Sequence, residues 1–221
     1  MVALTCEFCG TVVRSGAEFC DECCTPIPAP EDIAEFKQVT VLFADVVRSM
    51  DIALALDFEQ LHHIMTELAE RSTEVVNRFG GSAAEFTGGG VMAIFGAPTA
   101  AEGHAIQACL AALEIQDEAK RLAVEFARRY GVAPRLGVGL NSGRAPVGAM
   151  RSGPIGCATP AEPVGSAQRM ESVSPGGGVM LSESTARLVE RDAVLGAPRR
   201  VQFQGCDAPV VVRRLLGVNA S

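Results

Sequence analysis

The chain has 221 residues, of which 48% are hydrophobic and 20% charged, and its formal net charge is −7. This size allows one domain of about 150–200 residues with a small appendage, and the apolar content excludes a disordered chain. The acidic balance argues against broad capture of nucleic acid or of an anionic membrane. No apolar run reaches the ~18–20 residues of a membrane helix, and the N-terminus lacks the regions of a signal peptide. We therefore expect a cytoplasmic protein that uses its cysteines as metal ligands or free thiols.

Five of the eight cysteines lie within the first 24 residues, where CEFC is followed by ten residues and then by CDEC. Two Cys-x-x-Cys pairs supply the four sulfur ligands that a structural zinc ion prefers. A redox pair or a disulfide is the alternative. We predict a zinc ribbon over residues 1–28, in which the metal supplies the folding energy of a segment too small for its own core. A stiff, proline-containing linker is expected over 29–36. The expected zinc ligands are Cys6, Cys9, Cys20 and Cys23, with Cys24 as a spare neighbour.

Hydrophobic patterning then predicts alternating strands and helices. An apolar run over 39–44, ending at Asp45, is typical of a buried strand. It is followed by a helix, a β-hairpin with a glycine turn, a second long helix and another strand. This β-α-β-β-α-β order is the ferredoxin-like unit of an α+β fold. The remaining expected ranges are helix 57–79, strands 83–87 and 91–95, helix 100–130, strand 135–140, helices 161–172 and 183–190, and strands near 179, at 200–204 and at 209–216. No internal repeat is evident.

Asp45 is the one residue whose place suggests chemistry, because strand ends are where such sheets offer ligands to metals or phosphates. An ordinary exposed strand-end acid is the alternative. The pair His62-His63 lacks the spacing of a zinc-binding helix, so a surface or packing role is expected for it. His104 follows Glu102 at the start of a helix, where a local packing or capping role is expected. The segment GVGLNSG has GxGxxxG spacing, which does not fit a dinucleotide-binding loop.

Several segments, in order and spacing, resemble class III adenylate and guanylate cyclases. VTVLFADVVRSM resembles the opening strand of that family, and EFTGGGVMAIFGAP resembles its hairpin. AEGHAIQACLAAL, GVGLNSGRAPVG, AQRMES and GGGVMLSESTARLV follow in the family order. The resemblance implies a class III nucleotidyl cyclase fold over 37–217, behind the zinc ribbon.

The family's reaction is attack of the ribose 3′-hydroxyl on the α-phosphate of ATP or GTP, which releases pyrophosphate. The resemblance implies two Mg²⁺ or Mn²⁺ ions held by two aspartates, together with groups that read the purine and steady the phosphates. It also implies a site formed between two subunits packed head to tail.

Most of these positions are substituted here. Asp45 stands at the first metal aspartate and Arg169 at the phosphate-steadying arginine. A turn-forming role for Asp45 and a salt-bridge role for Arg169 are the structural alternatives. The lost positions are Gly89 for the second metal aspartate, Gly165 for the ribose asparagine and Gln204 for the phosphate-gripping lysine; Glu85 and Ala158 stand at the purine-reading positions. Arg48 and Met50 also replace a glycine and a threonine of the phosphate-facing turn.

The expected function is therefore a degenerate cyclase-homology module with little or no turnover, acting as a homodimer or as the partner of an active cyclase. A weakly active adenylate or guanylate cyclase using Mg²⁺ or Mn²⁺ is the alternative, since guanylate cyclases carry a glutamate at the position of Glu85 and a cysteine near that of Ala158. Cys157 is one residue away from it. A third reading is a transcription-linked regulator that contacts nucleic acid through the ribbon. Arg14 is surrounded there by acidic residues, which weighs against this reading.

Overall fold

The computed structural model describes residues 5–6, 8–14, 17, 19–25, 35–85, 90–97, 102–147, 161–204 and 208–219. A small cysteine-bearing segment precedes a larger α+β domain, which begins with β1 at Glu35, inside the range expected for the linker. No helix in the described parts of the chain is long and apolar enough to cross a membrane.

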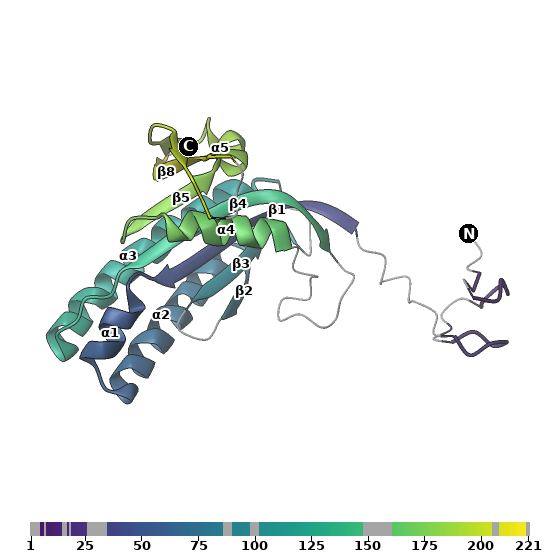
Figure 1. Ribbon diagram of the computed structural model, residues 1–221, viewed down its shortest axis with the longest axis horizontal. Helices are drawn as coiled ribbons and strands as arrows, with labels where there is room; N and C mark the ends of the chain where they lie inside the picture. The colour runs from purple at the N-terminus through teal and green to yellow at the C-terminus, as the bar shows by residue number, and fades with distance from the viewer. Residues whose placement is uncertain are drawn as a thin grey trace.

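The domain is built on one mixed sheet with the strand order β2-β3-β1-β4-β5-β8-β6, and β7 also pairs with β8 (Figure 1). β1 lies at the centre and pairs antiparallel with both β3 and β4, whereas β4 and β5 run parallel. The strands are β1 (Glu35–Val46), β2 (Ser82–Glu85), β3 (Val91–Phe95), β4 (Leu136–Val147), β5 (Gly178–Ser182), β6 (Ala193–Leu195), β7 (Arg199–Val201) and β8 (Val210–Val218).

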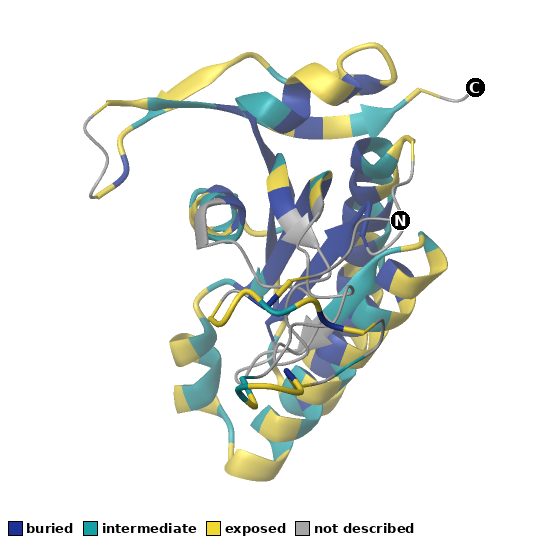
Figure 2. Ribbon diagram, turned by 90° about the vertical axis from the view of Figure 1, so that its right-hand side faces the viewer, coloured by how far each residue is buried: buried dark blue, intermediate teal, exposed yellow. Residues whose placement is uncertain are grey.

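Two long helices cover one face of the sheet and a shorter helix covers the other (Figures 1 and 2). Side chains on β1 alternate between these layers, as a pleated strand requires. Leu42 and Ala44 belong to the core shared with α2 and α3, and Val41 and Phe43 to the smaller core under α4. The helices are α1 (Ser49–Ala55), α2 (Phe58–Arg78), α3 (His104–Tyr130), α4 (Ala161–Ser172) and α5 (Glu183–Val189).

The glycines of GVGLNSG have a packing role. Gly137 and Gly139 face α4, and a Cβ added at position 139 would overlap the backbone of α4 at Ala167 and Glu171. Side-chain-free positions on β4 therefore let the backbone of α4 approach the sheet closely. This explains the glycine spacing that does not fit a dinucleotide-binding loop.

The order β1-α-β2-β3-α3-β4 confirms the expected ferredoxin-like unit and α+β class. The long helices were predicted to within a few residues, and β1 and β4 extend well beyond their apolar runs. Two elements were not predicted, namely α1 and β6. His104 has the expected packing role, because its Nδ1 lies 2.8 Å from the hydroxyl of Thr40 on β1.

Candidate functional sites

The N-terminal cysteines form a compact cluster. The Sγ atoms of Cys6, Cys9, Cys20 and Cys23 all lie within 4.8 Å of one another. Cys6 and Cys23 are 3.6 Å apart, and Cys9 and Cys20 are 3.5 Å apart. A tetrahedral zinc ion with Zn–S bonds of about 2.3 Å holds its sulfurs roughly 3.8 Å apart. The four thiols therefore have the number, the chemistry and the spacing of a zinc site.

The two cysteine pairs repeat one local structure, which was not noticed in the sequence. In CEFCGT the amide of Gly10 donates to Cys6 O at 2.8 Å, and in CDECCT the amide of Cys24 donates to Cys20 O at 2.9 Å. The two positions have φ angles of 73° and 56°, so both are left-handed. Cys24 thus occupies the place that glycine takes in the first repeat.

A threonine completes each repeat. The hydroxyl of Thr11 lies 3.4 Å from Cys9 Sγ, and that of Thr25 lies 3.1 Å from Cys23 Sγ. Hydrogen bonds with Thr11 lower the pKa of Cys9 to about 6, and those with Thr25 lower the pKa of Cys23. The pKa of Cys20 is raised to about 11, because the backbone hydrogen bonds that lower it are outweighed by its burial and its contacts with Cys9 and Cys23. Since metals bind the thiolate, both threonines favour the ligating form.

Asp45 lies near the end of β1, on the face of the sheet that α4 covers. It is half-buried, and the amide of Val46 donates to its Oδ1 at 2.7 Å. Burial raises the pKa of this carboxyl, and the Val46 hydrogen bond opposes that rise. Gly90, where the chain enters β3, is close enough that a Cβ there would lie 3.6 Å from Asp45 Oδ1. The start of β3 therefore lies beside Asp45.

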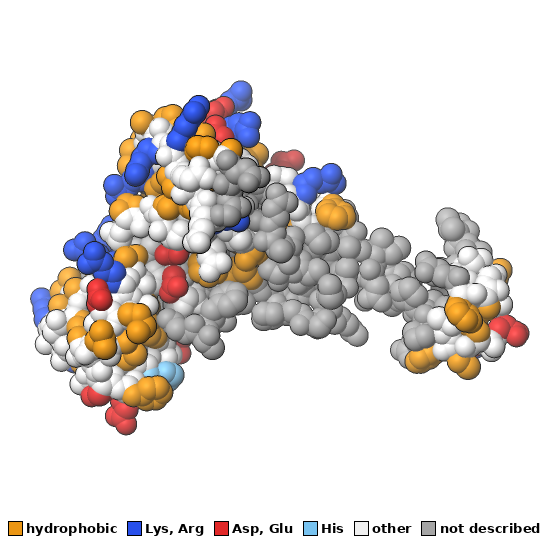
Figure 3. Space-filling view, in the orientation of Figure 1, with side chains coloured by type: hydrophobic (Ala, Val, Ile, Leu, Met, Phe, Trp, Pro, Cys, Tyr) orange, Lys and Arg blue, Asp and Glu red, His pale blue; other side chains and the backbone are white. Residues whose placement is uncertain are grey.

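The turn after Asp45 is unusual for a phosphate-facing turn. Arg48 has a φ of 56°, a left-handed conformation that the glycine of the family pattern adopts without strain. It precedes α1, which begins without a side-chain cap and buries none of its residues. Met50 and Leu54 on α1 and Phe58 on α2 are 70%, 83% and 81% exposed. Figure 3 shows exposed hydrophobic side chains over the part of the molecule that holds these two helices.

Glu171 on α4 is a neighbour of Asp45 that sequence reasoning missed. It lies over Gly137, the residue that pairs with Asp45 across β1 and β4. Burial, and secondarily the charge of Asp45, raise the pKa of Glu171 to about 7. The sequence could not have shown this, because only the close packing of α4 on the glycines of β4 brings the two carboxyls together.

Arg169 and Gly165 lie on α4, and Arg169 is exposed without an ion pair to any described carboxylate. Arg169 lines a cavity of about 210 Å³ with Asn141 and Glu183, apart from Asp45. A Cβ at Gly165 would meet no atom within 4 Å. Gln204, after β7, is exposed.

The remaining predicted site residues are only partly described. The backbone of Glu85 pairs with Val91 at the end of β2, but its side chain lies outside the described structure. Gly89, Cys157 and Ala158 also lie outside the described residues.

The described donor set does not fit a pair of divalent ions beside Asp45. Among residues that the structure describes, the cysteine cluster is the only group of three or more His, Cys, Asp or Glu side chains arranged to hold an ion. The second metal position of the family is a glycine, which offers no carboxylate.

Residues 31–207 match the family described as the adenylate and guanylate cyclase catalytic domain. No curated protein matches the chain. Its fold is similar to that of the guanylyl cyclase Cya2, with a TM-score of 0.76, 24% identity, and coverage of 84% of this chain and 95% of the other.

Two further structures are also similar. The guanylate cyclase domain of RhGC from Catenaria anguillulae, crystallised with GTP, has a TM-score of 0.72 and 24% identity, covering 84% of this chain and all (100%) of that one. The non-canonical dimeric guanylyl cyclase domain of the RhoGC fusion protein from Blastocladiella emersonii has a TM-score of 0.68 and 25% identity, with coverage of 84% and 100%. Together with the central sheet and the helix layers described above, the family match shows that the chain belongs to the adenylate and guanylate cyclase catalytic domain family.

Proposed function

We propose that this chain is a cyclase-homology protein that regulates or signals through dimerisation and makes little or no cyclic nucleotide. The observation that carries the proposal is the set of residues at the functional positions of the family. Asp45 and Arg169 are kept, whereas Gly89, Gly165 and Gln204 lack the acid, the amide and the cation expected there. Loss of one transition-state donor typically costs about 2.7–4 kcal/mol, or 10²–10³ in rate. Such losses are not additive, but three together leave little turnover.

Packing does not account for the two lost positions that are described. Gly165 faces open space, and an asparagine would fit there. Gln204 is exposed, where a lysine would be equally well solvated. Since the family residues would fit at both positions, their replacement is better explained by relaxed selection for catalysis than by a requirement of packing.

The first test is a cyclase assay of the full chain with Mn²⁺ and either ATP or GTP, with an active class III cyclase as positive control. We expect no cyclic nucleotide above background. Turnover that Asp45→Ala abolishes would overturn the proposal and establish an active enzyme. Turnover that Asp45→Ala leaves unchanged would identify a contaminant.

Restoration is the complementary test. The triple variant Gly89→Asp, Gly165→Asn, Gln204→Lys replaces the missing acid, amide and cation. We expect cyclic nucleotide formation above the wild-type level, since each group returns to its family position. A matched variant that also carries Asp45→Ala should lose the gain.

Dimerisation is the second part of the proposal. The dimeric Blastocladiella domain and the exposed apolar side chains of Met50, Leu54 and Phe58 support a module that contacts another protein surface. We expect light scattering of the full chain at micromolar concentration to give the mass of a dimer. A monomer alone, with no binding to an active cyclase domain, would contradict this role.

A weakly active or GTP-binding protein is the second candidate. Glu85 favours it, because it matches the purine-reading residue expected of guanylate cyclases. Calorimetric titration with GTP should then show binding that Glu85→Lys reduces. Equal or absent binding in both proteins would leave position 85 without a purine-reading role.

We also propose that residues 1–28 form a zinc ribbon, that 29–36 link it to the domain, and that 37–217 make up the cyclase-homology domain. The close sulfur cluster supports Cys6, Cys9, Cys20 and Cys23 as zinc ligands. Elemental analysis should find about one zinc per chain. The double variant Cys6→Ser, Cys20→Ser should contain none.

A further inference from the structure

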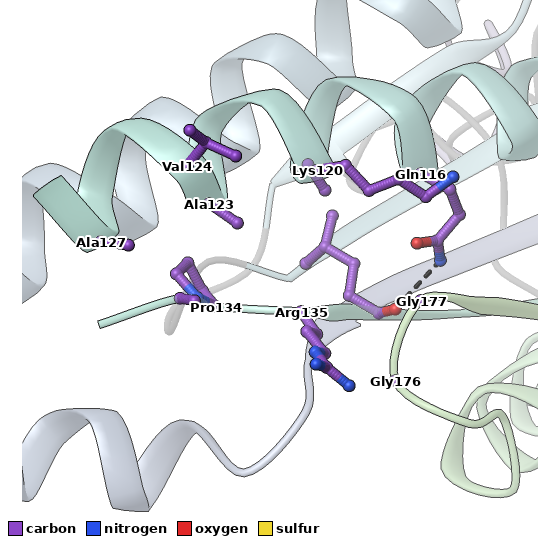
Figure 4. A pocket seen from close by; sticks show the side chains of 12 residues that line it. Gln116, Lys120, Ala123, Val124, Ala127, Pro134, Arg135, Gly176 and Gly177 are labelled. Carbon is purple, nitrogen blue, oxygen red and sulfur yellow. Dashed lines mark hydrogen bonds between the residues drawn. The ribbon is translucent and has the colours of Figure 1, made fainter. Parts of the chain in front are cut away.

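A groove runs between α3 and the start of β4, and its residues Arg135 and Gly176 also line the neighbouring cavity at the turn of Arg48. The groove has a volume of about 450 Å³ and is closed at one end by the turn at Gly176 and Gly177 (Figure 4). We call it the α3–β4 groove. Its volume lies within the range of small-molecule sites in proteins.

Small and apolar side chains make up the walls of the groove. Ala119, Ala123 and Ala127 face it from successive turns of α3, and Pro134 and Leu136 face it from the start of β4. Such walls offer contact to the apolar body of a ligand. Small residues alone, however, do not define a site.

Gln116 adds a buried polar group to the apolar walls. Its residue is only 4% exposed, and its Nε2 donates to Leu136 O at 3.0 Å and to Gly178 O at 2.8 Å. Both hydrogen bonds fix the amide so that its oxygen is turned to the cavity side (Figure 4). That oxygen accepts no hydrogen bond from any described residue. Among the described residues, Glu183 Oε2 is the only fully buried side-chain polar atom without a partner. Gln116 Oε1 is therefore open to the groove, where the N–H or O–H group of a ligand would take the place of a water molecule.

Two cations lie at the rim of the groove. Lys120 is partly neutralised by Asp117 at 2.7 Å, whereas Arg135 forms no ion pair with a described residue. The side-chain stem of Arg135 lies over Gly176, where a Cβ would come within 3.3 Å of its Cδ. No carboxylate lines the groove. The rim is therefore complementary to an anion.

We propose that the α3–β4 groove binds a small anionic amphiphile that combines an apolar body, an N–H or O–H donor and a carboxylate or sulfonate group. The apolar body contacts Ala123 and Pro134, the donor pairs with Gln116 Oε1, and the anion lies beside Arg135. The proposal does not depend on nucleotide binding or turnover by the chain.

The probe for the test is 8-anilinonaphthalene-1-sulfonate, which carries all three features and fluoresces when bound. We expect saturable binding at one site per full-length chain. The neutral N-phenyl-1-naphthylamine has the same body and donor without the sulfonate, and it should bind more weakly. Absence of saturable binding by the anionic probe would overturn the proposal.

Variants locate the site. Ala123→Phe fills the groove and should weaken binding at least ten-fold; Ala127→Phe, at an exposed position of the same wall, repeats the test with less risk to folding. Glu125→Phe, on the solvent side of α3, should bind as the wild type does, and so should Leu54→Ser at an exposed position of α1. Arg135→Gln should weaken the anionic probe about two- to five-fold, as expected for one exposed charge contact, and leave the neutral probe unchanged.

Two results would contradict the assignment. Equal probe binding by Ala123→Phe and Ala127→Phe would place the probe elsewhere. If these variants instead shift the sedimentation of the chain from dimer to monomer, the groove is an interface between copies rather than a ligand site.

Discussion

Gly139 is where the backbone of α4 comes closest to the sheet. Gly139→Ala would place a methyl group against the backbone of Ala167 and Glu171, which can only move together with the helix. We expect a loss of about 3 kcal/mol or more in the free energy of unfolding, at the upper end of overpacking effects. Chemical denaturation followed by circular dichroism measures it.

Gly165 provides the matched control for this substitution, because it lies in α4 itself with open space around it. Gly165→Ala should raise stability by roughly 0.5–1 kcal/mol, since alanine loses less entropy in a helix. If both alanine variants were equally stable, the close approach of α4 to β4 would be wrong.

Glu171 makes the stability of the fold depend on pH. Its pKa is about 7 in the folded chain, above its ordinary value of 4.5. Folded protein therefore holds this proton more tightly than unfolded protein does, and stability falls as pH rises through this interval. Below pH 4.5 the carboxyl is neutral in both the folded and the unfolded state, so Glu171 no longer makes the free energy of unfolding depend on pH.

The variant Glu171→Gln removes this titration. We expect its melting temperature to exceed that of the wild type by a margin that grows from pH 5 to pH 8. For the control Glu70→Gln, at an exposed position of α2, the difference in melting temperature from the wild type should stay constant over the same pH range. A constant margin for Glu171→Gln as well would rule out the raised pKa. Thermal melts in a series of buffers of equal ionic strength distinguish these outcomes.

At the scale of elements, the spacing of apolar residues was enough to predict those helices and strands that bury a continuous face. α1 was missed because it buries no side chain, and its Met50 and Leu54 point to solvent. β1 and β4 extend beyond their apolar runs because backbone pairing continues past them, for example between Gln38 and Arg144. Such pairing depends on the register of a distant strand, which local sequence does not encode.

For the candidate site beside Asp45, the sequence predicted only which residues stand at the functional positions of the cyclase family. Asp45 was placed correctly at a strand end, because a buried apolar run leads directly into it. The proximity of Glu171 to Asp45 and the position of the Gln116 amide beside the groove both arise from helix packing and could not be predicted from spacing. The glycines of β4 were visible in the sequence, but their purpose became clear only with α4 packed over them.

The paired cysteine knuckles also allow a prediction at this scale. Cys24 takes a left-handed conformation in which a non-glycine residue costs about 1–2 kcal/mol. Cys24→Gly should therefore keep the zinc and bind it several-fold more tightly. Cys23→Ser should lose it. Competition with a chromophoric zinc chelator measures both, and loss of zinc in Cys24→Gly would identify Cys24 as a ligand.

The whole molecule has separate hydrophobic cores in its two parts. Cys6, Val13 and Cys20 form one small cluster with Ala17 and Cys23, and none of the described residues of the larger domain belongs to it. We therefore expect the proposed ribbon to depend on a bound metal for its folding energy, whereas the domain has the cores on either side of its sheet. Removal of zinc should therefore unfold the ribbon and leave the larger domain folded.

We expect a strong chelator to release about one zinc per chain and to leave the melting temperature of the main calorimetric transition unchanged within about 1 °C. The reason is that a ligand stabilises only the cooperative unit that binds it. The N-terminal amide protons should meanwhile lose their protection from exchange, and those of β1 and β4 should keep theirs. Cys6→Ser, Cys20→Ser is the matched variant and should reproduce both effects without chelator. A fall of several degrees in the main transition would instead mean that the ribbon packs on the cyclase-homology domain and that its zinc stabilises both.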